Sequence, residues 1–235
     1  MNSKKRMEML NDPDDPDEQA DKGEKSVRRF QITLSEYNRI YQVVHGVLND
    51  IGYPEKACIF FACFGAMMLN KHFKIRARAV AGGFALCVNE TPQVTFFGQI
   101  EEGRALISAE GFHMWVQTQS HIIDFMAPIY TEAFAETRAN LIIPRKMFQR
   151  PFGSEAQSLN DLNSPGDFFT LPDPKLTEAL IDDFFSKNSR GDLLMVADQW
   201  FGGRRRKQKR SLVIQNDLGE KHQLTLPPTM AAGSW

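Results

Sequence analysis

Apolar residues recur at helical spacing in two consecutive segments near the start of the folded region. The first opens with TLSE at residues 33–36, which resembles a helix capping box, and apolar side chains follow at three- and four-residue intervals. The second, EKACIFFACFGAMMLNKHF at residues 55–73, is apolar nearly all round, which is typical of a buried central helix. The pattern predicts two helices joined by a turn at residues 51–54, with folded structure beginning near Phe30.

From about Ile75 the apolar period shortens to the alternation of β-strands. Five successive segments rich in valine, isoleucine and aromatic residues predict an antiparallel sheet. The Gly82-Gly83 pair in the first of them predicts a bend or a close approach of another backbone. The five segments are IRARAVAGGFALCV (75–88), QVTFFGQI (93–100), RALISA (104–109), FHMWVQTQ (112–119) and HIIDFM (121–126).

Helical spacing returns after Pro128, and the chain is expected to end in a hairpin. The polar stretch at residues 150–167 is predicted to be a loop, too hydrophilic to join the core. Asp173 is placed to cap the helix that follows this loop. The predicted elements are a short helix around residues 131–140, helices over 173–187 and 191–201, and a hairpin over 211–226 with its loop near 217–219.

Composition divides the chain into a tail and one domain of α+β class. Residues 1–29 are charged, rich in proline and nearly free of large apolar groups, so they are predicted to be a disordered tail. Residues 30–235 are predicted to form a single domain that includes the basic segment 204–210 and the C-terminal hairpin. The 42% hydrophobic content of the 235 residues is ample for such a core.

Overall charge, apolar runs and cysteine usage predict a cytoplasmic protein. With Lys+Arg 28 and Asp+Glu 29 the formal net charge is -1, so total charge indicates neither a nucleic-acid partner nor a membrane partner. The start of the chain has no apolar run of signal-peptide length, and no later stretch approaches the length of a membrane span. Cys58, Cys63 and Cys87 follow neither a disulfide framework nor a CxxC metal pattern, which fits a reducing compartment.

The segment GFHMWVQTQSHIIDF at residues 111–125 predicts a hairpin that carries an oriented base. If the turn lies near residues 118–119, positions whose numbers add to 237 face one another, and His113 lies opposite Asp124. A histidine paired with a carboxylate on the less apolar face of a sheet can act as a general base. Such a base needs an acidic partner to activate.

Cys58 is the candidate for that partner. Pro54 predicts the first turn of the helix near Cys58, and free N–H groups at a helix start favour a thiolate over a thiol. The same N–H groups could receive the oxyanion formed when a thiolate attacks an acyl carbon. The alternatives are a small core residue and a zinc site made with His113 and Asp124, which lacks a second thiol or histidine at ligand spacing. Cys63 lies about 140° further round the helix and is expected to be core.

Four segments carry a family resemblance that covers roughly residues 53–126. They are similar, in order, to a Cys-x-x-x-Ala helix start, an Ile-Pro-Ala-Arg strand entry, a His-x-Trp-hydrophobic segment and a hydrophobic-Asp segment. The chain thus resembles the papain-like cysteine enzymes, and most closely their transglutaminase-like branch. The four segments are CIFFA (58–62), FKIRARAVAGG (73–83), HMWV (113–116) and IID (122–124).

The resemblance implies an α+β, papain-like fold in which a central Cys-bearing helix packs on an antiparallel sheet with flanking helices. It also implies that Cys58 is the nucleophile, His113 the general base and acid, and Asp124 the group that orients the imidazole. Two departures are visible: Arg76 stands where the family commonly has proline, and the His-to-Asp interval is short. No glutamine lies just upstream of Cys58, so Asn49 is the candidate for the oxyanion side chain.

Two further features have both a functional and a structural interpretation. Trp115 shares the face of His113, so it either walls the cleft or simply packs in the core. The basic run has six cationic side chains in seven positions and could be a solvated loop, a targeting signal or a phosphate-binding patch; a solvated loop or contact with an acidic partner is expected. The run consists of Arg204, Arg205, Arg206, Lys207, Lys209 and Arg210.

The expected function is thiol-dependent acyl chemistry without a cofactor or metal. Cys58 would attack a peptide, amide, ester or thioester carbonyl, and His113 would shuttle the proton. Hydrolysis, as in a cysteine protease or amidase, is favoured over transglutaminase-like transfer because it needs only water. The alternative is a non-catalytic papain-like binding module that uses the basic run for an acidic partner or nucleic acid, and no membrane partner is expected.

Overall fold

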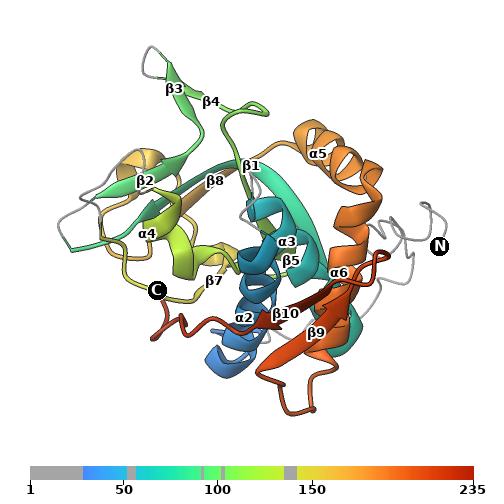
Figure 1. Cartoon of the computed structure of the whole chain (residues 1–235). Coiled ribbons are helices and arrows are strands. Elements are labelled where there is room, and N and C mark those ends of the chain that lie inside the picture. Colours follow the sequence, from blue (N-terminus) through green and yellow to red (C-terminus); the bar gives the residue numbers. More distant parts are fainter. Residues whose placement is uncertain (1–28, 52–56, 91–92, 102–103, 135–141) are drawn as a thin grey trace, which may run out of the picture.

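The chain folds into an antiparallel sheet with helices packed on it, which confirms the predicted α+β class (Figure 1). This computed structural model describes residues 29–51, 57–90, 93–101, 104–134 and 142–235. The helices are α2 (Leu34–Ile51), α3 (Ala57–Met68), α4 (Tyr130–Ala133), α5 (Pro174–Ser186) and α6 (Asn188–Phe201). The strands are β1 (Ala77–Cys87), β2 (Val94–Phe97), β3 (Gln99–Glu101), β4 (Arg104–Leu106), β5 (His113–Thr118), β6 (His121–Asp124), β7 (Phe148–Pro151), β8 (Phe168–Pro172), β9 (Ser211–Gln215) and β10 (Lys221–Thr225).

Strand β1 organises the main sheet because it pairs with three other strands. The order is β2-β1-β5-β6-β7, and β8 pairs with β1 as well, with every pairing antiparallel. Residues 77–82 of β1 pair with β5, and residues 84–87 pair with β2. A Cβ atom at Gly82 would lie 2.1 Å from the carbonyl oxygen of Leu171 in β8, so the close approach predicted at the glycine pair is confirmed.

Helix α3 is the buried central helix that its apolar sequence predicts. All of its residues except Met67 are buried. It packs on β1 and β5 and also contacts α2, α5 and α6 (Figure 1). At Gly65 a Cβ atom would lie 2.3 Å from a ring carbon of Phe125, so the helix sits directly on the sheet. A five-residue π-helical turn, Leu69–Phe73, ends the segment.

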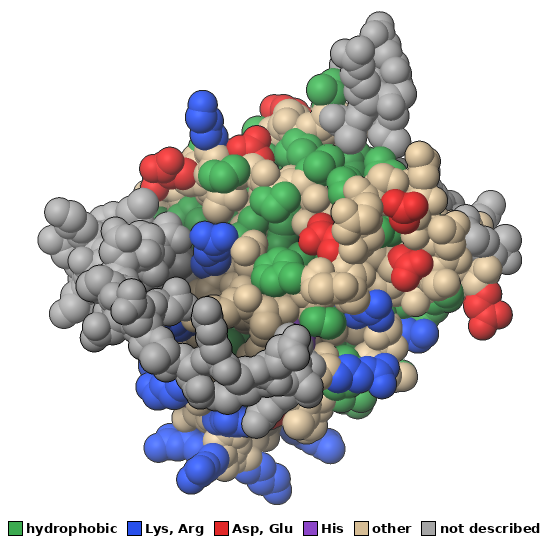
Figure 2. Space-filling view, turned by 180° about the vertical axis from the view of Figure 1, so that it is seen from behind, with side chains coloured by type: hydrophobic (Ala, Val, Ile, Leu, Met, Phe, Trp, Pro, Cys, Tyr) green, Lys and Arg blue, Asp and Glu red, His purple; other side chains and the backbone are tan. Residues whose placement is uncertain are grey.

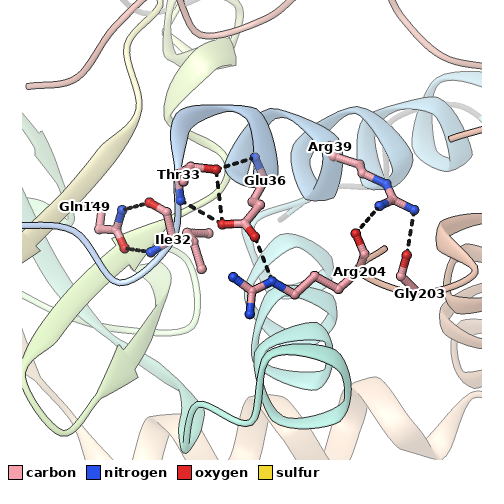
Figure 3. Close-up of polar contacts among 7 residues, drawn as sticks. All are labelled: Ile32, Thr33, Glu36, Arg39, Gln149, Gly203 and Arg204. Carbon is pink, nitrogen blue, oxygen red and sulfur yellow. Dashed lines mark hydrogen bonds and ion pairs between the residues drawn. The ribbon is translucent and has the colours of Figure 1, made fainter. Parts of the chain in front are cut away.

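Helix starts are set by the capping residues expected from the sequence. Thr33 N–H donates to Glu36 Oε2 at 2.9 Å, and Glu36 N–H donates to Thr33 Oγ1 at 3.3 Å, which completes the capping box of α2 (Figure 3). Asp173 accepts a hydrogen bond from Leu176 N–H at 2.9 Å at the start of α5. Both predicted caps are confirmed.

Two parts of the predicted sheet are wrong. The segment at residues 93–100 breaks at Gly98, whose φ of 155° favours glycine, and its second half pairs only with β4 in a separate two-stranded ribbon. The polar stretch predicted as a loop contains the end of β7 and the buried Leu162, and it is followed by β8, which the pattern missed. Both strands are short and owe their place to pairing with distant segments, which local periodicity does not report.

The structure describes the C-terminal end of the chain through Trp235, whereas residues 1–28 of the predicted tail lie outside the described residues. Arg29 is the first described residue, and its guanidinium lies 5.0 Å from the ring centre of Phe30. The larger core cluster runs from Ile32 to Trp235. Within the described ranges no helix is long and apolar enough to cross a membrane.

Candidate functional site

The β5–β6 hairpin has a different register from the one predicted. Val116 pairs with Ile123, so facing positions add to 239 rather than 237, and His113 is not directly opposite Asp124. The side chain of Thr118 sets the turn because its Oγ1 accepts the N–H of residue 121 at 2.9 Å. A shift of two residues leaves every side chain on its original face. His113 and Asp124 therefore share a face as diagonal neighbours.

The structure brings His113, Asp124 and Cys58 together. His113 Nε2 lies 2.5 Å from Asp124 Oδ2, and each side chain is 1% exposed. The second carboxylate oxygen, Oδ1, accepts the N–H of Met126 at 2.8 Å. Cys58 is in the first turn of α3 and is 6% exposed, and its thiol is hydrogen-bonded to the ring of His113. The three side chains form a triad in which the thiol contacts the imidazole and the imidazole contacts the carboxylate.

Two tyrosines that were not predicted from the sequence complete the polar surroundings of Asp124. The hydroxyl of Tyr130 donates to Asp124 Oδ2 and lies 3.3 Å from His113 Nε2. The hydroxyl of Tyr37, from α2, donates to the backbone oxygen of Asp124. Only Tyr130 has a signal in the local sequence that could have placed it near Asp124. It directly follows the 3-10 turn Ala127–Ile129, which contains a proline and reverses the chain after β6. Buried tyrosine hydroxyls usually find such a partner.

The surroundings of His113 raise its pKa and favour the protonated imidazole. Burial by itself lowers the pKa of His113, but the charge and hydrogen bond of Asp124, with a smaller contribution from Cys58, raise that pKa to about 9. Burial and the Asp124 charge raise the pKa of Tyr130 and of Tyr37 well above the ordinary value. Both tyrosines therefore remain protonated and act as hydrogen-bond donors.

Aromatic side chains enclose the imidazole of His113. The ring of Phe97, from β2, stacks on it at 4.2 Å between centroids with 26° between the planes. Phe84 lies on the same side of the sheet, 5.4 Å from His113 and 5.9 Å from Trp115. Phe134 packs against Phe97 at 4.6 Å. This apolar enclosure is the physical cause of the burial that weakens hydration of the triad.

The candidates for the oxyanion site and the cleft occupy different environments. Trp115 is 0% exposed and belongs to the core cluster. Packing in the core therefore fits this residue better than a place in the wall of an open cleft. Among the described residues its indole N–H has no hydrogen-bond partner. Asn49 lies near the end of α2 with an exposed side chain, and its role at the oxyanion site stays a prediction.

The other two cysteines are placed as core residues, as expected. Cys63 and Cys87 are both 0% exposed, and all three cysteines are free. Burial, with a smaller contribution from Cys58, raises the pKa of Cys63 to about 12. Burial also raises the pKa of Cys87. In the part of the chain that the structure describes, no group of three or more His, Cys, Asp or Glu side chains is placed to hold a metal ion.

The basic run forms an exposed loop between α6 and β9, as expected. It is hydrogen-bonded to α2, to α6 and to the backbone of Leu226. Arg204, for example, forms an ion pair with Glu36, at 2.7 Å between Nε and Oε1. All six cationic side chains are exposed, in contrast to the buried triad.

Comparisons with other proteins give one family and one solved structure. Residues 33–235 match the family described as "Protein of unknown function (DUF2026)". A solved structure described as "The crystal structure of genomics APC5867" is 32% identical in sequence, with a TM-score of 0.78. The similarity covers 89% of this chain and 100% of that chain. No curated protein matches the chain.

Proposed function

We propose that this chain, which belongs to the DUF2026 family of proteins of unknown function, is a papain-like thiol hydrolase acting on an amide, ester or thioester. The observation that carries the proposal is the consecutive contact of Cys58, His113 and Asp124. The three side chains come from a buried helix and two adjacent strands, in the chain order that the resemblance implies. A nucleophile, a base and an orienting group in consecutive contact are the arrangement that thiol-dependent acyl chemistry uses.

The reaction follows from the positions of the two ring nitrogens of His113. Asp124 engages Nε2, which leaves Nδ1 for the thiol. The Cys58 thiolate attacks the carbonyl carbon, a sulfur–carbon bond forms, and the π-electron pair moves onto the oxygen. Collapse of this intermediate breaks the bond to the leaving group, which takes the proton from the imidazolium. Water then gives a proton to His113 as it attacks the thioester, and the sulfur–carbon bond breaks to restore the thiolate.

Two features of the protein support charge development at this site. The raised pKa of His113 keeps the imidazolium available to stabilise a thiolate. Cys58 lies in the first turn of α3, where N–H groups without intrahelical partners can receive an oxyanion. Hydrolysis is favoured over transfer because the acyl-enzyme then needs only water as the acceptor.

Selective alkylation of the three thiols tests the proposal. Iodoacetamide should label Cys58 ahead of Cys63 and Cys87, which serve as internal controls because both are buried and have raised pKa values. The readout is mass spectrometry after brief labelling at several values between pH 5 and 9. His113→Ala should slow labelling of Cys58 because it removes the imidazolium. Asp124→Asn should slow it less because the ring remains.

Equal, slow labelling of the three thiols would contradict the proposal. If all three thiols react slowly and equally, and neither substitution changes the rates, Cys58 is not an activated nucleophile. The chain would then be a non-catalytic binding module. Thermal midpoints of both variants, measured in parallel, separate lost activation from lost folding.

A further inference from the structure

The proposed chemistry makes no use of the basic run at residues 204–210. Its six cationic side chains are exposed and lie in the loop that follows α6. The chain as a whole is nearly neutral, so this positive charge is local. Figure 2 shows that lysine and arginine side chains gather toward the lower edge of that view, whereas most acidic side chains lie elsewhere on the same face.

Arg39 of α2 holds the backbone of this loop in one conformation (Figure 3). Its Nη1 donates to the backbone oxygen of Arg204 at 2.8 Å, and its Nη2 donates to those of Phe201 at 2.6 Å and Gly203 at 2.9 Å. Its Nε donates to Gln208 Oε1 at 3.0 Å. One guanidinium thus uses four hydrogen bonds to fix both the start and the middle of the loop. The cationic side chains are therefore presented from an ordered backbone.

The side chain of Arg204 is attached to the body of the protein, unlike the other five cationic side chains of the run. Its ion pair with Glu36 and its position 4.7 Å above the ring of Phe73 attach it to the body of the protein. The nearest acidic residue at the end of α6, Asp198, is already engaged by Lys71 at 2.5 Å and His72 at 2.9 Å. Asp198 is thus already paired within the protein.

The remaining five cations are available to an external anion. Among the residues that the structure describes, none of their side chains forms an ion pair or a hydrogen bond. Only Gln208 interrupts the positive charge between residues 205 and 210. The five are Arg205, Arg206, Lys207, Lys209 and Arg210.

We propose that residues 205–210 bind the phosphate backbone of a nucleic-acid duplex without reading its sequence. The segment has no apolar or aromatic side chain, so it lacks the apolar anchors that bury surface in the core of protein interfaces and the aromatic surfaces on which single-stranded bases stack. Arginine forks and lysine ammonium groups both suit phosphate oxygens. The loop places no helix or strand in a groove, so phosphate contacts set the affinity.

The test uses the full chain and a fluorescein-labelled duplex of 20 base pairs, followed by anisotropy. Five phosphate contacts predict a slope of about -4.5 for log K against log salt, which is roughly a 500-fold loss of affinity between 50 and 200 mM salt. The double variant Lys207→Gln/Lys209→Gln should reduce the slope to about -2.7. The matched control is Lys175→Gln/Lys187→Gln, which removes two exposed lysines in and just after α5 and should leave the slope unchanged. A duplex of unrelated sequence should bind equally well.

A second variant tests the role of the ordered backbone. Arg39→Lys keeps the positive charge but cannot make the four hydrogen bonds to the loop. It should lower affinity about tenfold while the salt slope stays the same, with the thermal midpoint recorded to show that the protein is folded.

Several results would overturn the proposal. One is the absence of salt-dependent binding at 50 mM salt, and another is an equal effect of the control pair. Tighter binding to 20-residue polyglutamate than to the duplex would indicate an acidic protein partner instead. Tighter binding to phosphatidylserine vesicles would indicate a lipid surface.

Discussion

Replacing Asp124 by asparagine should remove a pH-dependent part of the free energy of unfolding. The pKa of His113 is 6.5 as an ordinary side chain and about 9 in the folded protein. A difference of this size corresponds to about 3 kcal/mol, because one pKa unit is worth about 1.4 kcal/mol. Both partners are 1% exposed, so solvent screening weakens the interaction little.

The sign follows from which state holds the proton more tightly. The folded protein binds the His113 proton more strongly than the unfolded chain does. The contribution is therefore fully present below about pH 6.5, declines as pH rises, and is lost near pH 9. In Asp124→Asn the main cause of the raised pKa is gone while burial, which lowers it, remains. The variant should lack this loss of stability.

Urea unfolding followed by tryptophan fluorescence at pH 6, 7, 8 and 9 measures the effect. The wild-type protein should exceed the variant in stability most at pH 6, and the difference should shrink by about 3 kcal/mol by pH 9. Asp198→Asn is a suitable control because it removes a carboxylate from another histidine pair whose side chains are more exposed, at 16% and 11%. It measures what the loss of such a pair costs in stability away from His113. Parallel stability curves for wild type and Asp124→Asn would refute the assigned interaction.

Three further substitutions test the packing around the site, each measured by urea unfolding. Tyr130→Phe removes a buried donor to Asp124 and should cost about 1 to 3 kcal/mol, with little loss if the hydroxyl is unimportant. Gly82→Ala would place a Cβ atom 2.1 Å from the carbonyl oxygen of Leu171 and should cost about 1 to 3 kcal/mol, whereas wild-type stability would argue against the close approach. Gln149→Ala removes a buried amide that hydrogen-bonds the backbone ahead of α2 and should cost about 2 to 4 kcal/mol, with Gln149→Glu as the control that keeps one acceptor.

Helices were predictable because their signals are local. The capping box at Thr33 and Glu36 and the cap at Asp173 lie within four residues of the groups they bond. The continuous apolar sequence of α3 reports burial on all sides. By contrast, β7 and β8 depend on strands that are far away in the sequence. The spacing of apolar residues along the chain therefore could not identify these two strands.

The hairpin shows how a wrong register can still leave His113 and Asp124 on the same face of the sheet. The turn was misplaced because the side-chain acceptor at Thr118 decides it, and turn chemistry of this kind is weakly visible in a string of polar residues. Strand side chains alternate with a period of two, so the two-residue error returned His113 and Asp124 to the same face. An error of one residue would have placed them on opposite faces.

The surroundings of the triad could not be predicted from the hairpin itself. Tyr37, Phe97 and Tyr130 reach His113 or Asp124 from three different elements. Their positions depend on how the helices and β2 pack on the sheet. For Tyr37 and Phe97 the sequence provides no period or spacing that links them to the hairpin, and only the folded chain shows the imidazole enclosed by aromatic rings.

Helix α2 supports both the thiol site and the basic loop, through different side chains. Tyr37 faces inward and donates to the backbone oxygen of Asp124, whereas Glu36 and Arg39 hold the loop. These residues lie within one turn, and at about 100° per residue Tyr37 points away from the direction of its neighbour Glu36. The lysines at positions 207 and 209 contact none of the triad residues in the described structure. Neutralising them should leave thiol reactivity intact, so failure of the duplex proposal and failure of the thiol proposal can be told apart.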